Sequence, residues 1–314
     1  MARPTRRRVL RILAAAAATS LAPPARAESF EWRGAALGAD VSVVFSSADA
    51  AAAEAAVARI VAEVERLESI FSLQRGDSEL ARLNAAGRLD APSPDLVHVL
   101  ARSREAYATT RGKFDPTVQP LWTFHVDWYA ADRRRARPTE EDLADVRSRV
   151  GFSRVRIAPE AIELPARGAL TLNGVAQGHI TDRATDLLRA AGFRNVLVDL
   201  GETRVIETRV DGSAWRLELP DGRRIALSGG ALATSSGAAT QFADNGDHHI
   251  FDPATGRPAP HWRWLSVAHP SATVADGLST GLYCLPPAEA ARAARDMAGV
   301  RIWGATAAGE TVET

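Results

Sequence analysis

Helix-like and strand-like segments alternate along this chain of 314 residues, but without the regular strand–helix–strand rhythm of a doubly wound sheet. Residues 39–45 have the pattern of a strand, and apolar residues then recur at helical spacing from Val57 to Phe71, behind a Ser46-Ser47 start. Residues 195–200 read as a short apolar strand. The segments 205–209, 215–219 and 224–227 have the pattern of a β-meander. The predicted class is therefore α+β.

Further helices are predicted to start at Ser93-Pro94, at Thr139 and at Asp182, since each position offers a capping or acidic residue before an apolar pattern. Residues 122–138 differ in character, because they interleave aromatic side chains with a run of arginines. This segment has the composition of a lid or partner-facing loop over a flat anionic ligand, and equally that of a plain solvated turn. The chain shows no low-complexity linker and no internal repeat, so it is expected to form one domain or two closely packed lobes.

The N-terminus has the layout of an export signal. A basic region is followed by an alanine-rich apolar run and by Ala25-Arg26-Ala27, which resembles a cleavage site. Thr5 to Arg11 fits the twin-arginine pattern, with an ordinary secretory signal as the alternative. We therefore expect residues 1–27 to be a twin-arginine-type signal peptide, residues 28–314 to be the catalytic domain, and the location to be periplasmic. No later stretch is apolar enough to predict a membrane span in the mature form.

Charge and cysteine content narrow the classes of function. The formal net charge is zero, but six arginines lie in the signal, and without them the chain has 32 basic and 38 acidic side chains. No basic face is left over for a phosphate backbone, so no nucleic-acid partner is expected. Cys284 is the only cysteine. It is predicted to be buried and inert, and an internal disulfide is impossible.

Two stretches near the C-terminus carry the chemistry. In the first, His248 to Gly256, His249 is close to an extended segment and to an Asp-Pro turn. In the second, Asp276 and Thr280 are four residues apart, so on a helix their side chains point the same way. A carboxylate and a hydroxyl suit a hard cation that also binds phosphate, which predicts an enzyme acting on a phosphate ester or anhydride. The alternative is that Asp276 and Thr280 are ordinary polar residues at the start of a helix and that His249 is a packed loop histidine.

Several blocks of the chain are similar, in order, to those of the FAD:protein FMN transferase family, also called the ApbE family. They are Phe71-Ser72 with Asp77-Ser78-Glu79-Leu80 and Leu83-Asn84, Gly112 to Val118, Gly174 to Gly178, Val198 to Gly201, Ala233 to Ser235, and the two C-terminal stretches. Any one block is a weak signal, and their agreement in order is what makes the resemblance specific. It implies an α+β, T-fold-like bilobal single catalytic domain with mixed or antiparallel sheets and flanking helices.

The resemblance also implies an activity. Family members bind FAD and Mg²⁺ and transfer FMN to a threonine hydroxyl of an acceptor flavoprotein, with release of AMP. By the family pattern Asp276 and Thr280 are side-chain metal ligands, Ala176 contributes a backbone carbonyl, and His249 is the general base. An all-oxygen ligand set fits Mg²⁺ and argues against Zn²⁺. The other predictions are an FAD diphosphatase, which would release FMN and AMP, and a non-catalytic periplasmic flavin-binding accessory protein.

Further residues are expected to contact FAD, although turn geometry alone would explain many of them. Gly174 and Gly178 allow close approach of the backbone to the ligand, and Asp182 follows them. Ser78 and Glu79 are assigned to the adenine end, and Asp199, Thr234 and Ser235 to the flavin or ribityl part. The cofactor-binding set is Gly38, Ser78, Glu79, Asp115, Gly174, Gly178, Asp182, Asp199, Thr234 and Ser235.

The chain departs from the family pattern at several positions. Gln177 stands where lysine is usual, His179 where tyrosine is usual, and Glu202 where glycine or asparagine usually follows. Asn173 and Leu37-Gly38-Ala39 also differ. Loss of the lysine removes a cation near the flavin or its phosphates. This set of variants resembles a NosX-like periplasmic branch, which implies an acceptor such as a membrane electron-transfer protein among the nitrous oxide reductase accessory factors.

Overall fold

The computed structural model describes residues 29–36, 39–130 and 132–314. The predicted signal peptide and Gly38 lie outside the described residues. Within them, an antiparallel sheet of eight strands runs through the molecule in the order β1-β2-β6-β7-β10-β13-β14-β15. The strands are β1 (Phe30–Ala36), β2 (Ala39–Phe45), β6 (Val196–Asp199), β7 (Thr203–Val205), β10 (Gly230–Ser236), β13 (Trp262–His269), β14 (Arg301–Thr306) and β15 (Thr311–Glu313).

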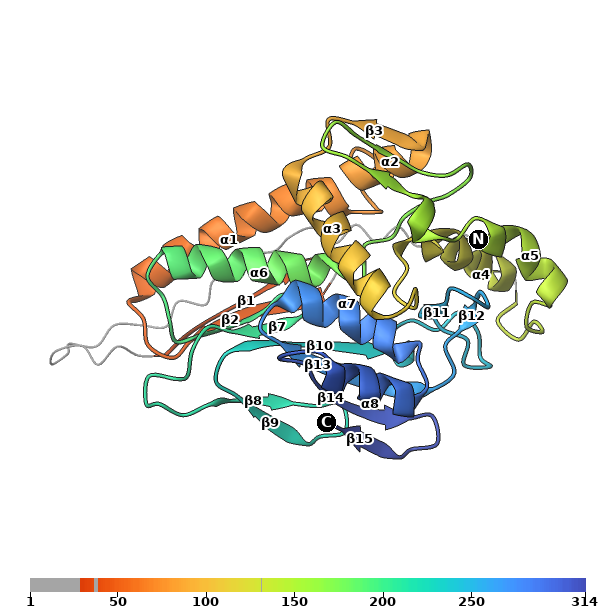
Figure 1. The fold of residues 1–314 in the computed structure, drawn as a ribbon. Coiled ribbons are helices and arrows are strands. Elements are labelled where there is room, and N and C mark those ends of the chain that lie inside the picture. The colour runs from red at the N-terminus through yellow and green to blue at the C-terminus, as the bar shows by residue number, and fades with distance from the viewer. Residues whose placement is uncertain (1–28, 37–38, 131) are drawn as a thin grey trace, which may run out of the picture.

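Helices cover one face of this sheet and a hairpin covers the other (Figure 1). The helices on this face are α1 (Ala50–Phe71), α6 (Ala176–Ala190), α7 (Ala272–Tyr283) and α8 (Pro287–Asp296), and α3 (Pro94–Thr109) packs on α1 and α7. Three helices, α2 (Glu79–Ala86), α4 (Gln119–Tyr129) and α5 (Glu140–Ser148), lie beyond the sheet. The hairpin consists of β8 (Trp215–Glu218) and β9 (Arg224–Leu227). Adjacent residues of β14 show the two layers, because Ile302 packs with α7 and α8 whereas Trp303 packs with Leu217 of the hairpin.

Smaller elements extend the molecule beyond the main sheet (Figure 1). One three-stranded sheet lies beside α2, and a two-stranded ribbon lies beside α4 and α5. These elements are β3 (Arg88–Asp90), β5 (Ala161–Glu163) and β4 (Arg156–Ile157), then β11 (Phe251–Asp252) and β12 (Arg257–Pro258), and the short 3-10 helices η1 (Pro116–Val118), η2 (Phe152–Arg154) and η3 (Gly237–Ala239). The predicted α+β class with antiparallel sheets and flanking helices is confirmed.

Capping residues set several helix starts as the sequence predicts. Ser93 accepts a hydrogen bond from the Leu96 N–H at the start of α3. Thr139 and Asp142 exchange hydrogen bonds in a capping box at the start of α5. Helix α1 differs from its prediction, because Asp49 caps it in place of Ser46 or Ser47 and the helix begins at Ala50. Cys284 is buried, as predicted, and burial raises the pKa of its thiol well above the usual range.

Three further local predictions are wrong. Residues 122–129 are the greater part of helix α4, not a loop, because Leu121, His125 and Tyr129 recur every four residues and pack into an aromatic cluster with Phe251. Helix α6 begins at Ala176, six residues before Asp182. The third error concerns residues 205–209, where only Val205 belongs to a strand, and that strand pairs with β6 and β10 instead of with the hairpin.

The sequence predicts no membrane span after the N-terminal segment. Among the described residues, the structure contains no helix with the length and apolar composition needed to span a bilayer.

Candidate active site

A cavity of about 240 Å³ opens where segments distant in the sequence meet. Its walls come from the η1 region, the turn before α6, strand β10, the segment 249–251 and helix α7. The structure brings seven of the predicted site residues to this cavity, namely Asp115, Gly174, Thr234, Ser235, His249, Asp276 and Thr280. The predicted catalytic histidine and both side-chain metal ligands therefore line one space.

Helices α6 and α7 form the frame that holds the metal-ligand candidates. From α6, the Asp182 carboxylate accepts hydrogen bonds from the backbone N–H groups of Ala272 (2.8 Å) and Thr273 (3.0 Å) in the first turn of α7. From α7, Asp276 Oδ2 accepts a hydrogen bond from the Gly178 N–H of α6 (3.0 Å). Each helix thus satisfies free N–H groups of the other, which fixes their relative positions.

Asp182 acts in this frame instead of lining the cavity. Its carboxylate also accepts hydrogen bonds from the hydroxyls of Ser271 and Thr273, at 2.7 Å each, and forms an ion pair with Arg204. Both oxygens are therefore engaged within the protein. A direct contact of Asp182 with FAD stays a prediction, and the structure places its carboxylate on the N-terminus of α7.

Two glycines allow the close approach of α6 and α7. A Cβ atom at Gly178 would lie 2.3 Å from the backbone oxygen of Ala272, and one at Gly174 would lie 2.8 Å from Thr280 Oγ1. Contacts this short do not occur, so any larger residue would displace backbone at Gly178 or the Thr280 hydroxyl at Gly174. The Gly-x-x-x-Gly spacing therefore serves the packing around Thr280 and Asp276.

Asp276 and Glu202 are buried carboxylates on the same cavity. Burial raises the pKa of Asp276 to about 7. Burial, with the Asp276 charge nearby, raises the pKa of Glu202 well above its usual range. Within the described part of the chain, no arginine, lysine or histidine forms an ion pair with either of them. Such a pair is costly when ionised, because like charges repel and little water is present to screen them.

This arrangement fits a hard divalent cation. Asp276 and Thr280 present oxygen atoms from successive turns of α7, and Ala176, at the start of α6, lies in the same frame. No group of three or more histidine, cysteine, aspartate or glutamate side chains with metal-binding geometry occurs among the residues that the structure describes. A cation held by Asp276, Thr280 and the Ala176 carbonyl would have oxygen ligands alone, and would take its other ligands from water and phosphate, as Mg²⁺ does.

Hydroxyl groups surround this position. Ser235 Oγ lies 2.8 Å from Ser279 Oγ and 3.4 Å from Thr280 Oγ1. Thr234 precedes Ser235 on β10. Its Oγ1 lies 2.7 Å from Ser266 Oγ, and its N–H donates to the Glu202 carboxylate (3.2 Å). The Ala-Thr-Ser block therefore connects β10 to both α7 and Glu202, with two hydroxyls at the wall of the cavity.

His249 presents a basic nitrogen to the same cavity. Its Nδ1 lies 3.2 Å from the backbone oxygen of Thr240. Because a carbonyl oxygen can only accept, Nδ1 must carry the proton in the neutral ring, which leaves the lone pair on Nε2. Burial lowers the pKa of His249, so the ring is neutral near pH 7. These are the properties that a general base requires.

Asp115 lines the cavity but is engaged in holding η1. Its Oδ1 accepts hydrogen bonds from the N–H and the hydroxyl of Thr117, and its Oδ2 accepts one from the Phe152 N–H (3.1 Å). Burial raises the pKa of this carboxyl despite these hydrogen bonds. Asp115 therefore fixes one wall of the cavity.

Three more predicted FAD contacts, Ser78, Glu79 and Asp199, are not among the residues that line the cavity. Ser78 caps α2 by accepting from the Ala81 N–H (3.0 Å), and its hydroxyl donates to the Ser72 carbonyl (2.6 Å). Glu79 accepts a hydrogen bond from the Ser93 N–H at the start of α3 (2.9 Å). Asp199 ends β6 and accepts from the Gly201 N–H (3.3 Å), and burial raises its pKa. Their assignment to FAD stays a prediction.

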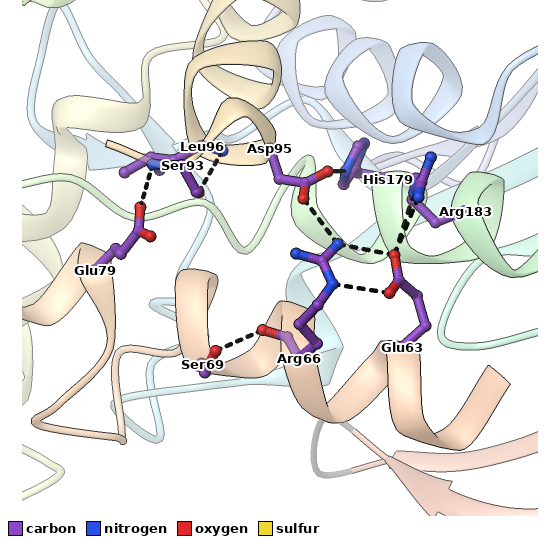
Figure 2. A network of polar contacts seen from close by, with 9 residues as sticks. All are labelled: Glu63, Arg66, Ser69, Glu79, Ser93, Asp95, Leu96, His179 and Arg183. Atoms are coloured by element: carbon purple, nitrogen blue, oxygen red, sulfur yellow. Dashed lines mark hydrogen bonds and ion pairs between the residues drawn. The ribbon is translucent and has the colours of Figure 1, made fainter. Parts of the chain in front are cut away.

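A network of ion pairs holds the first turns of α6 from the side opposite the cavity. Figure 2 shows Arg66 of α1 between Glu63 and Asp95, at 2.8 Å from each. His179 of α6 lies 3.3 Å from Asp95, and Arg183 lies 3.3 Å from Glu63 (Figure 2). The network joins α1, α3 and α6, so the family-variant residue His179 is a packing residue here and not a cavity contact.

Lys113 and Glu202 also line the cavity, and the sequence patterns predicted neither as a site residue. Glu202 differs from the residue usual in the family, and the pairing of β7 with β10 brings its carboxylate close to Asp276. Lys113 occupies the variable position of the Gly-x-Phe-Asp-Pro block. The signal that could have found them is their charge, since each is an ionisable residue inside or beside a matched block.

Comparisons with known proteins identify a family and similar structures. The model of the ApbE family matches residues 37–303. A Vibrio cholerae protein named FAD:protein FMN transferase is 31% identical over 239 residues, which cover 70% of each chain. A Haemophilus influenzae protein of the same name is 29% identical over 250 residues, covering 72% of this chain and 71% of the relative. Among solved structures, the apo form of the flavinyl transferase ApbE from Pseudomonas stutzeri has a TM-score of 0.78 at 26% identity, covering 93% of this chain and 97% of that one.

Proposed function

Because the chain belongs to the ApbE family, we infer that it is an FAD:protein FMN transferase, an enzyme that moves FMN from FAD to an acceptor flavoprotein. The observation that carries this function is the convergence of His249, Asp276 and Thr280 on one cavity, with the lone pair of His249 on Nε2. A base and an oxygen-ligand set are the groups that phosphoryl transfer to a hydroxyl requires.

The proposed reaction starts at a threonine hydroxyl of the acceptor. His249 Nε2 accepts the hydroxyl proton while the threonine oxygen attacks the phosphorus that carries the FMN part. A phosphoester bond forms, the bond from that phosphorus to the bridging oxygen breaks, and its electron pair leaves with AMP. Bound Mg²⁺, held by Asp276, Thr280 and the Ala176 carbonyl, would neutralise charge on the diphosphate as it reacts.

The chain's own residues prepare this step. Thr240 orients the imidazole through the hydrogen bond to Nδ1, so that Nε2 is the nitrogen free to take a proton. Gly178 holds one oxygen of Asp276 by its N–H, which leaves the other available for a cation. Gly174 leaves room for the Thr280 hydroxyl. The proposed roles of Thr234 and Ser235 are hydrogen bonds to the ribityl or flavin part of FAD.

The setting of the enzyme is proposed from the N-terminal sequence. Thr5 to Arg11 and Ala25-Arg26-Ala27 support twin-arginine export and a periplasmic location. A folded export route would allow FAD and Mg²⁺ to bind before transport. The variant residues Gln177 and Glu202 support a NosX-like branch, with a membrane electron-transfer protein as the acceptor.

One experiment separates the proposed transferase from the two other functions considered. The mature protein is mixed with FAD, Mg²⁺ and a flavin-acceptor domain, and the acceptor is examined by mass spectrometry for an FMN-sized increment. An increment that disappears with EDTA and with Asp276→Ala supports the transferase. Free FMN and AMP without an increment would mean an FAD diphosphatase, and bound, unaltered FAD would mean a flavin-binding accessory protein.

A further inference from the structure

Lys113 brings a positive charge to the wall of a cavity that also has three carboxyl groups. Among the described residues of the cavity wall, it alone has an ammonium or guanidinium group, whereas Asp115, Glu202 and Asp276 have carboxyls. We propose that Lys113 binds the diphosphate of FAD, so that its ammonium and the metal neutralise the substrate together. This inference rests on the proposed function, because it takes FAD as the ligand of the cavity.

Hydrogen bonds hold the backbone at Lys113 in place. The Lys113 N–H donates to the Thr110 carbonyl (3.1 Å), and the Phe114 N–H donates to the Thr110 hydroxyl (2.9 Å). Gly112, with φ of 81°, turns the chain between α3 and η1, and its N–H donates a hydrogen bond to the Tyr107 carbonyl (2.7 Å). The side chain therefore extends from a fixed point, and its flexible four-carbon stem can aim the ammonium at a ligand.

In the structure the ammonium rests on Asp252, with Nζ 2.7 Å from Oδ2. Asp252 lies in β11, three residues after His249, and its Oδ1 is held by the Ala254 N–H (3.0 Å). An ammonium has three N–H donors, and this ion pair uses one. The Lys113 ammonium therefore keeps two N–H donors for a phosphate oxygen, in the cavity that His249 also lines.

Two observations favour a ligand over a purely structural ion pair. The Lys113 ammonium belongs to a residue of the cavity wall whose side chain is 24% exposed, so a ligand that enters the cavity can reach it. No other ammonium or guanidinium group lines the described wall, so a doubly negative diphosphate would have only Lys113 and the metal to neutralise it. A compact ammonium suits a phosphate group as a point charge.

The test compares FAD with riboflavin, which has the same flavin ring but no phosphate. Binding is measured by flavin fluorescence in the presence of Mg²⁺, for the unmodified protein and for Lys113→Gln, Lys113→Arg and Asp252→Asn. Loss of a charge-assisted hydrogen bond predicts about ten- to hundredfold weaker FAD binding by Lys113→Gln. Riboflavin binding is expected to be unchanged, and Lys113→Arg is expected to restore most of the FAD affinity.

Asp252→Asn distinguishes phosphate binding by Lys113 from a purely structural role of the Lys113–Asp252 ion pair. It removes the same ion pair but leaves the ammonium in place, so FAD affinity should be equal to or higher than that of the unmodified protein. If Lys113→Gln and Asp252→Asn weaken FAD binding equally, the proposal is overturned, because a structural ion pair depends on both of its partners alike. Normal FAD binding by Lys113→Gln, or equal loss of riboflavin binding, would also overturn it. Absence of FAD binding by the unmodified protein would instead overturn the proposed function.

Discussion

His248 and His249 are neighbours in the chain but carry their protons on opposite ring nitrogens. His248 Nδ1 accepts a hydrogen bond from the Ile250 N–H (3.3 Å), so its Nε2 carries the proton and donates to the Ala259 carbonyl (3.1 Å). His249 donates from Nδ1 to the Thr240 carbonyl and keeps its lone pair on Nε2. One histidine therefore holds the segment in place, and the other is available to accept a proton.

Replacing His249 by alanine is expected to slow FMN transfer by about two to four orders of magnitude, because the acceptor hydroxyl then loses its general base. FAD affinity should change little, since the ring is not assigned to substrate binding. Single-turnover transfer at saturating FAD measures the rate. A transfer rate equal to that of the unmodified protein would remove His249 from the mechanism.

His248 is expected to make the fold less stable in acid. Burial lowers its pKa from 6.5 to about 4, and the His249 ring adds to this effect. The unfolded chain therefore binds this proton first, so the contribution to stability is complete above pH 6.5 and is lost as the pH falls from there toward 4. Thermal unfolding between pH 8 and pH 4.5 should show a shallower decline for His248→Gln. An identical decline would mean that other groups account for the acid sensitivity.

Replacing Asp276 by asparagine is expected to abolish stabilisation by Mg²⁺ and to stabilise the metal-free protein at high pH. The folded-state pKa of Asp276 is about 7, above the ordinary 3.8, so the folded protein keeps this proton at pH values where the unfolded chain has lost it. The fold therefore loses stability as the pH rises from 3.8 toward 7. Asparagine has no proton to lose and can still accept from Gly178.

The measurement for Asp276→Asn is the unfolding temperature in EDTA and in Mg²⁺, at pH 5 and at pH 8. A ligand at about a hundredfold its dissociation constant stabilises a fold by about 2.7 kcal/mol, which such a scan detects. The same Mg²⁺ response in the variant and in the unmodified protein would exclude Asp276 as a ligand.

Gly178→Ala is expected to destabilise the protein by about 1–3 kcal/mol, which is typical of forced overpacking. Its Cβ would lie 2.3 Å from the Ala272 oxygen, which is backbone and cannot rotate away. Gly76→Ala is the matched control, because a Cβ there has no atom within 4 Å among its neighbours. Chemical denaturation of both variants gives the comparison, and equal stability would contradict the close packing of α6 on α7.

The sequence predicts those parts of the site in which spacing along one element decides the geometry. Asp276 and Thr280 are four residues apart on a helix, so their shared direction follows from the helical period. The capping residues Ser93 and Thr139 are also recognisable locally, because their hydrogen bonds are to residues three positions away.

What the sequence does not predict depends on contacts between distant segments. The Glu202 carboxyl comes close to that of Asp276 only through the pairing of β7 with β10. Asp182 accepts hydrogen bonds from the start of α7, which lies 89 to 91 positions later in the sequence. The aromatic residues of α4 resemble those of a ligand-covering loop until Phe251, from far along the chain, covers His125. Composition alone cannot distinguish these two uses of an aromatic segment.

The reciprocal bonding of α6 and α7 bears on how fast a cation can enter and leave. Asp182 and Asp276 bind the two helices to each other through the protein's own N–H groups, so the oxygens for a metal are arranged when the chain folds. Loading the site then requires no movement of either helix. We expect the rate of exchange to follow the rate at which the ion sheds water, and therefore to differ between Mg²⁺ and Mn²⁺ while the protein conformation stays the same.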